Sequence, residues 1–256
     1  MKKTAYITGA SSGIGEEFAR QLLNTYRVVL IARNQSKLES LSQEFRKISP
    51  DSNPIILCLD LTQVSDVKTL CNKMKEDTSL GLLINNAGYG TIGGFADLKI
   101  EEELREIQLN VTTLVETTHA ALQNFKQQKS GAIINVASIA GYLPAPYSAT
   151  YAATKAYVRS FTESIFEELR DSGISIQALC PGLTHSDFHQ RAGIEKSNFP
   201  NFMWMTAEEV VTASLLALKR NQVICIPGGV NQSAVGLTNL LPSSITRKVA
   251  GMLMKK

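Results

Sequence analysis

The chain has 256 residues, of which 44% are hydrophobic and 19% charged, and its formal net charge is +3. This composition is close to that of an average globular protein, which excludes a disordered, collagen-like or fibrous chain. No uncharged apolar run approaches the ~18 residues that cross a bilayer, and Gly9 interrupts the first apolar stretch too early for a signal peptide. We therefore expect a cytoplasmic protein in which residues 1–256 form a single domain, since α/β folds commonly reach roughly 250 residues as one unit.

Seven apolar runs of strand length alternate with segments that carry a helical pattern. Several runs are apolar throughout, which is typical of strands that are covered on both faces in a parallel sheet. Thr206, followed by Glu209 three residues later, predicts a capping box at the start of one helix. The predicted strands cover residues 4–8, 28–32, 55–59, 82–84, 132–136, 174–179 and 223–226, and the predicted helices cover 15–24, 101–125, 149–170 and 207–219.

This alternation predicts an α/β fold with a doubly wound parallel sheet of about seven strands and helices on both faces. No internal repeat or low-complexity linker divides the chain. In such a sheet, ligands bind beyond the carboxyl ends of the strands, where the strand order reverses. The residues that follow each predicted strand are therefore the candidate functional residues.

The cysteines form no C-x-x-C pair, and three of them lie inside apolar runs. We therefore expect small buried side chains in a reducing compartment, with no disulfide framework. They are Cys58, Cys71, Cys180 and Cys225.

A glycine-rich turn with the sequence TGASSGIG, at residues 8–15, joins the first predicted strand to the first predicted helix. Glycine lets the backbone turn tightly and approach a pyrophosphate, while the helix N-terminus offers unpaired N–H groups and a partial positive charge. Three glycines in a turn also occur without a ligand, but the position between a first strand and a helix favours a dinucleotide site. The candidate cofactor contacts in this turn are Gly9, Ser11, Ser12, Gly13, Ile14 and Gly15.

The second predicted strand ends at Ala32 and is followed directly by Arg33. Strands of this kind that bind NAD usually end in an acidic residue, which holds the ribose hydroxyls. Arg33 can instead pair with a 2′-phosphate and stack on adenine, and Ser11 can add a hydroxyl donor. The sequence therefore predicts NADP(H) over NAD; the alternative is an arginine that only opens a helix in solvent.

Polar residues also follow the third and fourth predicted strands. Asp60 can bind a ligand or cap the next helix, a role for which Thr62 competes. The sequence NNAG at residues 85–88 places two amide side chains where they can tie strand ends together, with flat backbone against a ligand. Neither signal is specific by itself.

Ser138 follows the fifth predicted strand, and Tyr151 and Lys155 lie one turn apart on the same face of the next helix. A phenol normally titrates at about 10, and we expect the ammonium of Lys155 to lower the pKa of Tyr151 toward the working range. The hydroxyl of Ser138 would hold the oxygen of a reacting carbonyl against the phenol. A Tyr-x-x-x-Lys pair alone arises by chance, so this prediction depends on its occurrence together with the serine and the glycine-rich turn.

Taken in order, these residues resemble the short-chain dehydrogenase/reductase family in its single-domain form. The resemblance rests on the glycine-rich turn, Asp60, NNAG at 85–88, Asn110, Ser138, YAATK at 151–155 and PG at 181–182. It implies a Rossmann-type fold, with Asn110, Ser138, Tyr151 and Lys155 as the catalytic residues. Asn110 would bend its helix and hold a water in a proton relay with Lys155.

The same resemblance implies further contacts with a bound cofactor. Asp60 would hydrogen-bond the adenine, and the segment after Pro181 would contact the carboxamide of the nicotinamide. Ser186 stands where the family most often has threonine, which keeps the hydroxyl. The further cofactor contacts that the resemblance implies are Leu61, Asn86, Ala87, Gly88, Tyr151, Lys155, Pro181, Gly182, Thr184 and Ser186.

The resemblance also implies an enzyme, because no catalytic position is missing. We expect an NADPH-dependent carbonyl reductase that transfers hydride to a ketone or aldehyde, with Tyr151 as the general acid. NADP(H) in a reducing cytosol favours reduction; the alternative within the family is alcohol oxidation. The alternative from another class is a protein that senses NADPH without turnover.

Large apolar side chains gather within residues 187–205, where this family usually has a substrate lid. Core packing between two helices explains them equally well, whereas a lid would favour a hydrophobic substrate such as a 3-oxoacyl or steroid-like ketone. His185, Asp187 and His189 lie close in sequence, but Ser186 occupies the position where a zinc-protease helix needs Glu, so we expect no metal. The apolar residues are Phe188, Phe199, Phe202, Met203, Trp204 and Met205.

Residues 228–256 form a basic, amphipathic C-terminal extension. No acidic residue follows Glu209, whereas six basic residues do. The extension could contact an anionic membrane or pack on the domain or a second subunit, and Pro242 together with a modest apolar face favours packing. The extension lacks interleaved aromatic residues, so we expect no nucleic-acid partner. Homo-oligomers (dimers or tetramers) are usual in the family, and we expect one here.

Overall fold

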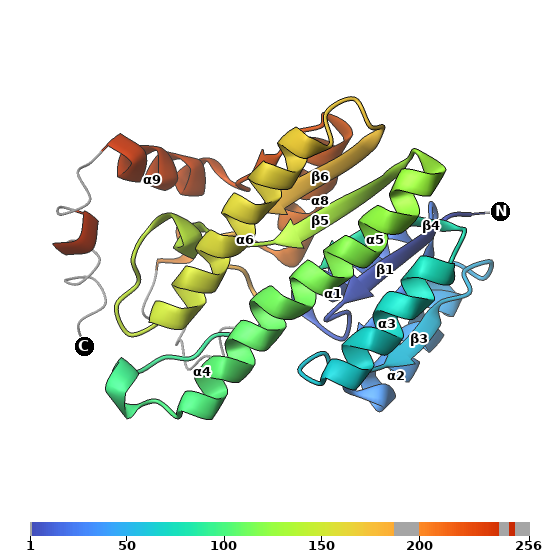
Figure 1. Cartoon of the computed structure of the whole chain (residues 1–256), viewed down its shortest axis with the longest axis horizontal. Helices are drawn as coiled ribbons and strands as arrows, with labels where there is room; N and C mark the ends of the chain where they lie inside the picture. Colours follow the sequence, from blue (N-terminus) through green and yellow to red (C-terminus); the bar gives the residue numbers. More distant parts are fainter. Residues whose placement is uncertain (1, 187–199, 241–245, 249–256) are drawn as a thin grey trace.

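The structure, a computed structural model, describes residues 2–186, 200–240 and 246–248 and contains a seven-stranded parallel sheet (Figure 1). Its strands are β1 (Thr4–Thr8), β2 (Arg27–Ala32), β3 (Ile55–Cys58), β4 (Leu80–Asn85), β5 (Gly131–Val136), β6 (Ile174–Leu179) and β7 (Ile224–Cys225). The strand order is β3-β2-β1-β4-β5-β6-β7, so the winding reverses between β1 and β4. The predicted doubly wound sheet is confirmed, and its carboxyl edge at β1 and β4 is where a ligand is expected.

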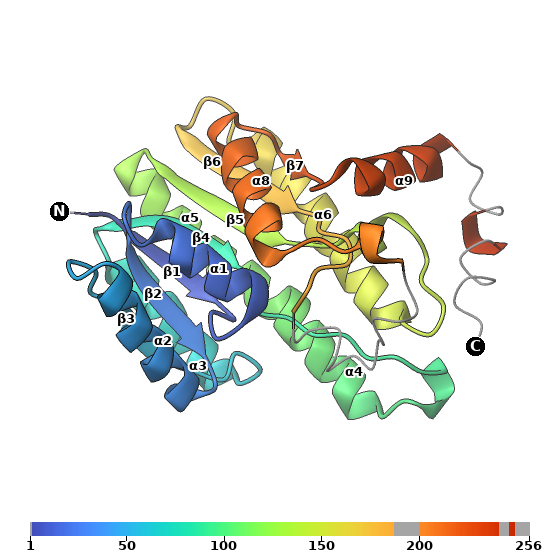
Figure 2. The ribbon, with the colours of Figure 1, turned by 180° about the vertical axis from the view of Figure 1, so that it is seen from behind.

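Helices cover both faces of the sheet. The layer in front in Figure 1 contains α3 (Val64–Glu76), α5 (Leu114–Gln128) and α6 (Ala149–Glu168). The opposite layer, in front in Figure 2, contains α1 (Gly13–Leu22), α2 (Gln35–Ile48) and α8 (Ala207–Lys219). A further helix, α9 (Gly229–Leu240), follows β7.

Alternate side chains of the strands enter two apolar cores, one on each face of the sheet. Ile7 of β1 packs with Phe18 of α1 and Phe45 of α2, whereas its neighbour Tyr6 packs with Phe125 of α5 on the other face. This arrangement explains why the strands are apolar at nearly every position: both faces of the sheet are covered by helices.

The long helix predicted over residues 101–125 is present but is not α-helical throughout. It begins as α4 (Ile100–Ile107), passes through a π-helical segment, η2 (Gln108–Thr113), and continues as α5. A π segment adds a residue to a helical turn, and such segments occur frequently at functional sites. Asn110 lies within η2, so the helix departs from regular geometry at this residue.

Several local predictions can be compared with the structure. The capping box is confirmed: the Thr206 side chain accepts from the backbone N of Glu209 at 3.1 Å, and the Glu209 carboxylate accepts from the backbone N of Thr206 at 2.8 Å. The predicted strand at 223–226 is shorter, Ile224–Cys225. Helices α2 and α3 lie between predicted strands but were not identified from the sequence, although Leu38, Leu41 and Phe45 of α2 have helical spacing.

One cysteine differs from the prediction. Cys71, Cys180 and Cys225 are buried, but Cys58 is exposed, so the expectation of four buried thiols is wrong at this position. Cys58 ends β3, the edge strand of the described sheet, and the side chains of this strand are only partly covered.

No helix within the described parts of the chain is long and apolar enough to span a bilayer.

Candidate active site

The glycine-rich turn closes the carboxyl end of β1 and leaves no room for a Cβ at its glycines. Gly9 and Gly13 have positive φ angles of 67° and 59°, which L side chains rarely adopt. A Cβ on Gly9 would lie 2.8 Å from Nδ2 of Asn86, and a Cβ on Gly15 would lie 2.4 Å from both that atom and the backbone O of Gly9. At these positions the turn presents only backbone, and we call it the glycine cradle; backbone of this kind before a helix can approach a pyrophosphate closely.

The first helix begins inside this cradle. Ser12 is the N-cap residue of α1, and its side chain makes no capping hydrogen bond, so it does not occupy the first N–H groups of the helix. Those N–H groups and the helix dipole form a site for an anion. The chain thus fits a dinucleotide at the place where the winding of the sheet reverses.

Asn86 and Thr8 tie the ends of β4 and β1 together. The side-chain amide of Asn86 donates to the backbone O of Thr8 at 2.9 Å and of Gly9 at 3.2 Å. In return, the Thr8 hydroxyl accepts from the backbone N of Asn86 and of Ala87, each at 2.9 Å. Asn85 points elsewhere, into the core, where it donates to Asn135 of β5 at 2.9 Å. The two asparagines of NNAG therefore have different roles: Asn86 joins the strand ends at the site, and Asn85 joins β4 to β5 in the core.

The residues predicted to contact the adenosine half lie at the ends of β2 and β3. Arg33 is exposed directly after β2, where no carboxylate side chain ends the strand. Asp60 is half-buried, and its Oδ1 accepts from the backbone N of Thr62 at 3.0 Å and from the Thr62 hydroxyl at 2.8 Å. The N-cap of α3 is Gln63, so neither Asp60 nor Thr62 caps that helix. Leu61, next to Asp60, is buried.

Ser138, Tyr151 and Lys155 come together beyond β5. A hydrogen bond joins the side chains of Ser138 and Tyr151. The Lys155 ammonium lies 5.7 Å from the centre of the Tyr151 ring and donates to the backbone O of Val136 at 2.7 Å. It also approaches NNAG: a Cβ on Gly88 would lie 3.6 Å from Nζ of Lys155. The structure thus places all three side chains beside the strand ends that carry the glycine cradle.

The electrostatics of this cluster differ from the expectation drawn from the sequence. The pKa of Tyr151 is raised to about 12, because burial of the phenol outweighs the hydrogen bond with Ser138. Lys155 does not lower it here; burial instead lowers the pKa of Lys155 itself to about 8. The predicted lowering of the Tyr151 pKa by Lys155 is therefore wrong in this structure, and at neutral pH Tyr151 holds its proton.

Asn110 uses its whole side chain to hold neighbouring segments. Its Oδ1 accepts from the backbone N of Tyr89 at 3.2 Å, and its Nδ2 donates to the backbone O of Tyr89 at 2.8 Å and to Thr154 of α6 at 3.1 Å. The π segment places this amide between α6 and the segment after β4, close to Gly88.

The segment after β6 folds against the glycine cradle. A Cβ on Gly13 would lie 2.9 Å from Cβ of Ser186, so the two loops are in contact. The Ser186 hydroxyl donates to the backbone O of Thr184 at 3.4 Å, and the Thr184 hydroxyl donates to the backbone O of Gly182 at 3.1 Å. Pro181 accepts from the backbone N of Ile139 at 3.0 Å, which joins this segment to the loop that carries Ser138.

A buried chain of polar side chains supports the catalytic helix from below. Asn85 accepts from Thr117 of α5 at 2.8 Å, and Asn135 donates to Thr162 of α6 at 3.0 Å. With the Asn85–Asn135 bond, this chain joins α5 to α6 through β4 and β5. Every member is hydrogen-bonded, so the chain fixes the position of α6 without leaving an unpaired polar group.

Two buried glutamates near the site were not identified from the sequence. Glu103 and Glu106 of α4 are 3% and 0% exposed, and both accept from the hydroxyl of Thr91, at 2.5 and 3.1 Å. Thr150, which precedes Tyr151, donates its hydroxyl to Glu103. The available signal was the spacing from Glu103 and Glu106 to Asn110, which places all three on one side of the helix.

The segment that precedes the predicted lid (187–205) is joined to the described C-terminal end of the lid. His185 donates its backbone N to the backbone O of Met205 at 2.9 Å, and Met205 donates to Leu183 at the same distance. The rings of His185 and Trp204 stack, with centroids 5.1 Å apart. Trp204 is buried and Phe202 is exposed, so the described residues divide between packing and an open surface. Asp187, Phe188, His189 and Phe199 lie outside the described residues.

Within the described residues, no group of three His, Cys, Asp or Glu side chains is arranged to hold a metal ion.

Known proteins are similar to this chain in sequence and in fold. The family model for short chain dehydrogenases matches residues 3–196, which is more than half of the chain. The chain belongs to the short-chain dehydrogenase/reductase family. Among solved structures, a short-chain dehydrogenase from Sphingobium yanoikuyae in complex with NADPH is 33% identical, with a TM-score of 0.84 over 94% of this chain and 97% of that one.

Two further members of the family indicate the range of its chemistry. A bulky-bulky ketone specific alcohol dehydrogenase from Comamonas testosteroni is 30% identical, with a TM-score of 0.79 over 94% of this chain and 96% of that one. A very-long-chain 3-oxoacyl-CoA reductase from Podospora anserina is 33% identical over 68% of this chain, and the match spans only 52% of that enzyme. This short-chain dehydrogenase is thus an oxidoreductase of carbonyl and alcohol groups.

Proposed function

We propose that this short-chain dehydrogenase is an NADPH-dependent carbonyl reductase in which Tyr151 donates a proton to the carbonyl oxygen. The observation that carries the proposal is the cluster of Ser138, Tyr151 and Lys155 beside a glycine cradle at the reversal point of the sheet. Because the raised pKa of Tyr151 keeps the phenol protonated, the group is ready to act as an acid. Alcohol oxidation would need the phenolate, which this environment disfavours.

Bound NADPH would supply the hydride. The glycine cradle and the N-terminus of α1 would hold its pyrophosphate, and Asp60 and Leu61 would flank its adenine. Asn86, Ala87 and Gly88 would lie along the bound dinucleotide. The nicotinamide would lie against the segment after β6, which contains Pro181, Gly182, Thr184 and Ser186. Ser138 would hold the substrate oxygen against the Tyr151 hydroxyl, which loses its proton to that oxygen. A proton would return to Tyr151 from the Lys155 ammonium, which would regain it through a water held at Asn110.

The preference for NADPH over NADH is supported by Arg33. Arg33 is exposed directly after β2, which ends at Ala32 and not at an acidic residue, so its guanidinium can pair with a 2′-phosphate. The relative from Sphingobium yanoikuyae, at 33% identity, was solved with NADPH.

A hydrophobic ketone or acyl chain is the substrate class that fits best. Phe202 and Tyr147, in the segments that precede α8 and α6, expose large apolar side chains, which supports an apolar substrate over a sugar. The names of the relatives from Comamonas testosteroni and Podospora anserina, which refer to bulky ketones and 3-oxoacyl-CoA, support the same class.

The decisive experiment compares Tyr151→Phe with Tyr157→Phe in a screen of NADPH oxidation over ketosteroids, 3-oxoacyl esters, diketones and aldehydes. Tyr157 lies two turns along the same helix with its ring on the outer face, so it is a matched control. We expect Tyr151→Phe to lower kcat/KM by about 10⁴-fold with NADPH binding retained, and Tyr157→Phe to leave turnover unchanged. Substantial turnover in Tyr151→Phe would refute the assignment.

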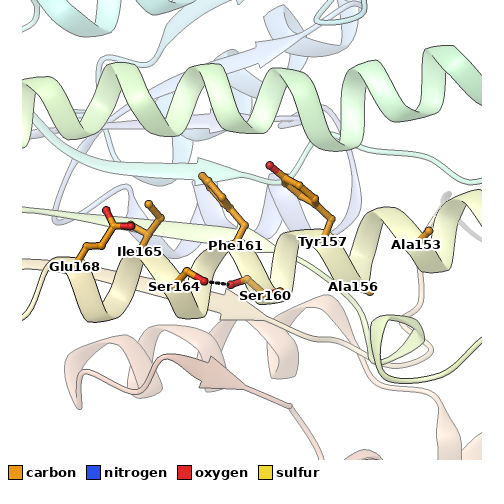
Figure 3. A pocket seen from close by; sticks show the side chains of 8 residues that line it. All are labelled: Ala153, Ala156, Tyr157, Ser160, Phe161, Ser164, Ile165 and Glu168. Carbon is orange, nitrogen blue, oxygen red and sulfur yellow. Dashed lines mark hydrogen bonds between the residues drawn. The ribbon is translucent and has the colours of Figure 1, made fainter. Parts of the chain in front are cut away.

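We also propose a homo-oligomer, in which the outer face of α6 is a contact surface. A pocket on this face is lined by Tyr157, Phe161 and Ile165, which project from one side of the helix (Figure 3). The rings of Tyr157 and Phe161 stack with centroids 5.8 Å apart. Light scattering of the wild type and of Phe161→Glu tests this: we expect a dimer or tetramer that dissociates in the variant.

The C-terminal extension is proposed to pack on protein, with contact to an anionic membrane as the competing proposal. In α9, Asn231 and Val235 are buried, and Asn231 donates to the backbone O of Pro227 at 2.7 Å. Arg247 and Lys248 are exposed. Pro242 and the terminal lysines lie outside the described residues. Salt-sensitive pelleting with anionic vesicles that is lost on deleting 243–256 would favour the membrane.

A further inference from the structure

Helix α4 has its polar and apolar sides reversed. Ile100 and Leu104 are 54% and 58% exposed, whereas Glu103 and Glu106 are buried. Burial of a carboxylate costs free energy unless partners compensate, so an ordinary surface helix would show the opposite orientation. Two inward acids on a single short helix therefore need an explanation that packing alone does not supply.

The buried side of α4 faces the catalytic side of α6. Glu103, Glu106 and Asn110 follow one another on this side, and hydrogen bonds attach its two ends to α6: Thr150 donates to Glu103, and Asn110 donates to Thr154. Glu106 lies between these two attachments. On α6 the two attachments are at Thr150 and Thr154. Tyr151 directly follows the first and Lys155 directly follows the second, so both side chains start close to the level of Glu106.

Glu106 is only half satisfied by hydrogen bonds. Its Oε2 accepts from the backbone N of Thr91 at 3.0 Å and from the Thr91 hydroxyl at 3.1 Å. Its Oε1 is buried and has no hydrogen-bond partner among the described residues. The segment that carries Thr91 also touches the active site, because a Cβ on Gly90 would lie 2.8 Å from the ring of Tyr151. A buried carboxylate with an unpaired oxygen exerts its charge over a longer range than an exposed one.

We propose that Glu106 is a positioning residue for the reaction, which keeps the ammonium of Lys155 charged through its own buried carboxylate. The proposal rests on the proposed function of Tyr151 and Lys155. Glu103 holds the N-terminal turn of α6 and the Thr91 segment, and its charge acts on Glu106 instead of on Lys155.

The titrating groups that face Glu106 are consistent with these different roles of Glu103 and Glu106. They are Glu103 on its own helix, Tyr89 on the segment after β4, and Tyr151 and Lys155 on α6. The pKa of Glu106 is raised to about 7, mainly by burial and also by the charge of Glu103, whereas the hydrogen bonds from Thr91 and the charge of Lys155 oppose this rise. In turn, Glu106 raises the pKa of Lys155 against the opposing effect of burial. Between pH values of about 7 and about 8, Glu106 is therefore a carboxylate while Lys155 is an ammonium.

The test is the pH profile of NADPH-dependent reduction in Glu106→Gln and Glu103→Gln. Both substitutions keep the side-chain shape and an oxygen that accepts from Thr91, and each removes one buried charge. Without the Glu106 carboxylate, Lys155 should lose its proton at lower pH, so the alkaline limb of kcat/KM should move down by about one unit, with about a fivefold loss at pH 8 and little loss at pH 6. Glu103→Gln should leave the alkaline limb in place, because Glu106 is already ionised there.

A role in folding alone predicts a different result. Loosening of α4 would lower kcat/KM by the same factor at every pH and would do so in both variants. Two results overturn the proposal. One is a pH profile of kcat/KM for Glu106→Gln whose alkaline limb coincides with that of the wild type once the maxima are scaled to be equal. The other is a shift of the alkaline limb in Glu103→Gln as large as that in Glu106→Gln.

A second readout does not depend on turnover. The ¹³Cε resonance of Lys155, assigned by its loss in Lys155→Met, reports the titration of the ammonium directly. We expect its midpoint to fall in Glu106→Gln and to stay in Glu103→Gln. A wild-type protein that reduces no carbonyl while this midpoint moves as expected would count against the proposed function and leave the Glu106–Lys155 coupling standing. An unmoved midpoint counts against the coupling.

Discussion

The two halves of the carboxyl edge of the sheet are built from different materials. Around β1 and β2, the site consists of backbone and exposed side chains: a cradle of glycines, an uncapped helix N-terminus and the solvent-facing Arg33. Around β4 and β5, it consists of buried polar side chains that are held by hydrogen bonds to neighbouring segments, such as Asn110, Ser138 and Lys155. Both halves lie at one edge, but they respond differently to substitution.

This difference teaches how each half performs its task. A nucleotide is bound by shape and surface charge, which the chain supplies without burying a charge. Proton transfer instead needs a dry environment that moves pKa values, and this environment is obtained by burying ionisable groups at a cost in stability. Substitutions in the first half should therefore change cofactor selection, and substitutions in the second should change rate and stability together.

Lys155→Met gives the largest expected effect that separates the halves. We expect a loss of about 10²- to 10⁴-fold in kcat/KM, because proton transfer through Tyr151 loses its partner. The lowered pKa of Lys155 also predicts a change in stability with pH. Since the unfolded chain binds this proton more tightly, its contribution to the free energy of unfolding is present above about 10.5 and is lost as the pH falls toward about 8.

Urea unfolding of the wild type and Lys155→Met at pH 7.5 and 10 measures that contribution as a difference, which cancels the other titrating groups. The wild type should gain stability relative to the variant as the pH rises. A difference that does not depend on pH would mean that Lys155 carries no burial cost, and the contrast between the halves would fail.

Arg33→Asp should change cofactor selection without changing the fold. Reversing the charge beside the 2′-phosphate position should lower the ratio of kcat/KM for NADPH to that for NADH by about 10- to 100-fold, since a charge-assisted bidentate contact is replaced by repulsion. Stability should change by less than about 0.5 kcal/mol, because the side chain is exposed.

Arg46→Asp is the matched control for this experiment. Arg46 is exposed on α2, away from the end of β2, and its substitution by Asp changes the net charge by the same amount. An equal change of the ratio in both variants would show a general electrostatic effect on the cofactor and would remove the specific role of Arg33.

Thr206→Ala is expected to have the smallest effect and to touch neither half of the site. It removes the side-chain acceptor of the capping box of α8, which should cost about 1 kcal/mol in the free energy of unfolding. kcat/KM and the ratio between the two cofactors should stay at wild-type values. A change in either quantity would show that α8 is coupled to the site.

Most of the fold, and the grouping of the candidate site residues at one edge of the sheet, could be predicted from local sequence. Continuous apolar runs indicated a sheet that is covered on both faces, and glycines at fixed spacing after the first run indicated a turn without room for Cβ atoms. Chemistry-bearing residues at the ends of successive strands could be placed together because parallel strands bring their carboxyl ends to one edge. The order of these residues along the chain was therefore sufficient to predict that they lie together.

The environment of those residues could not be predicted in the same way. The sequence shows that Lys155 follows Tyr151 by one turn, which led to an expected lowering of the Tyr151 pKa; the structure shows that burial raises it. Burial depends on which segments cover a side chain, and those segments come from distant parts of the chain.

Local sequence therefore determined the strands and the glycine cradle, because periodicity and backbone conformation are properties of neighbouring residues. Tertiary structure alone decided the orientation of α4, which buries Glu103 and Glu106 and exposes Ile100 and Leu104. Helical periodicity would place the apolar side inward. The reverse holds because Thr91 and Thr150, from two other segments, supply the hydrogen bonds that make two buried carboxylates tolerable.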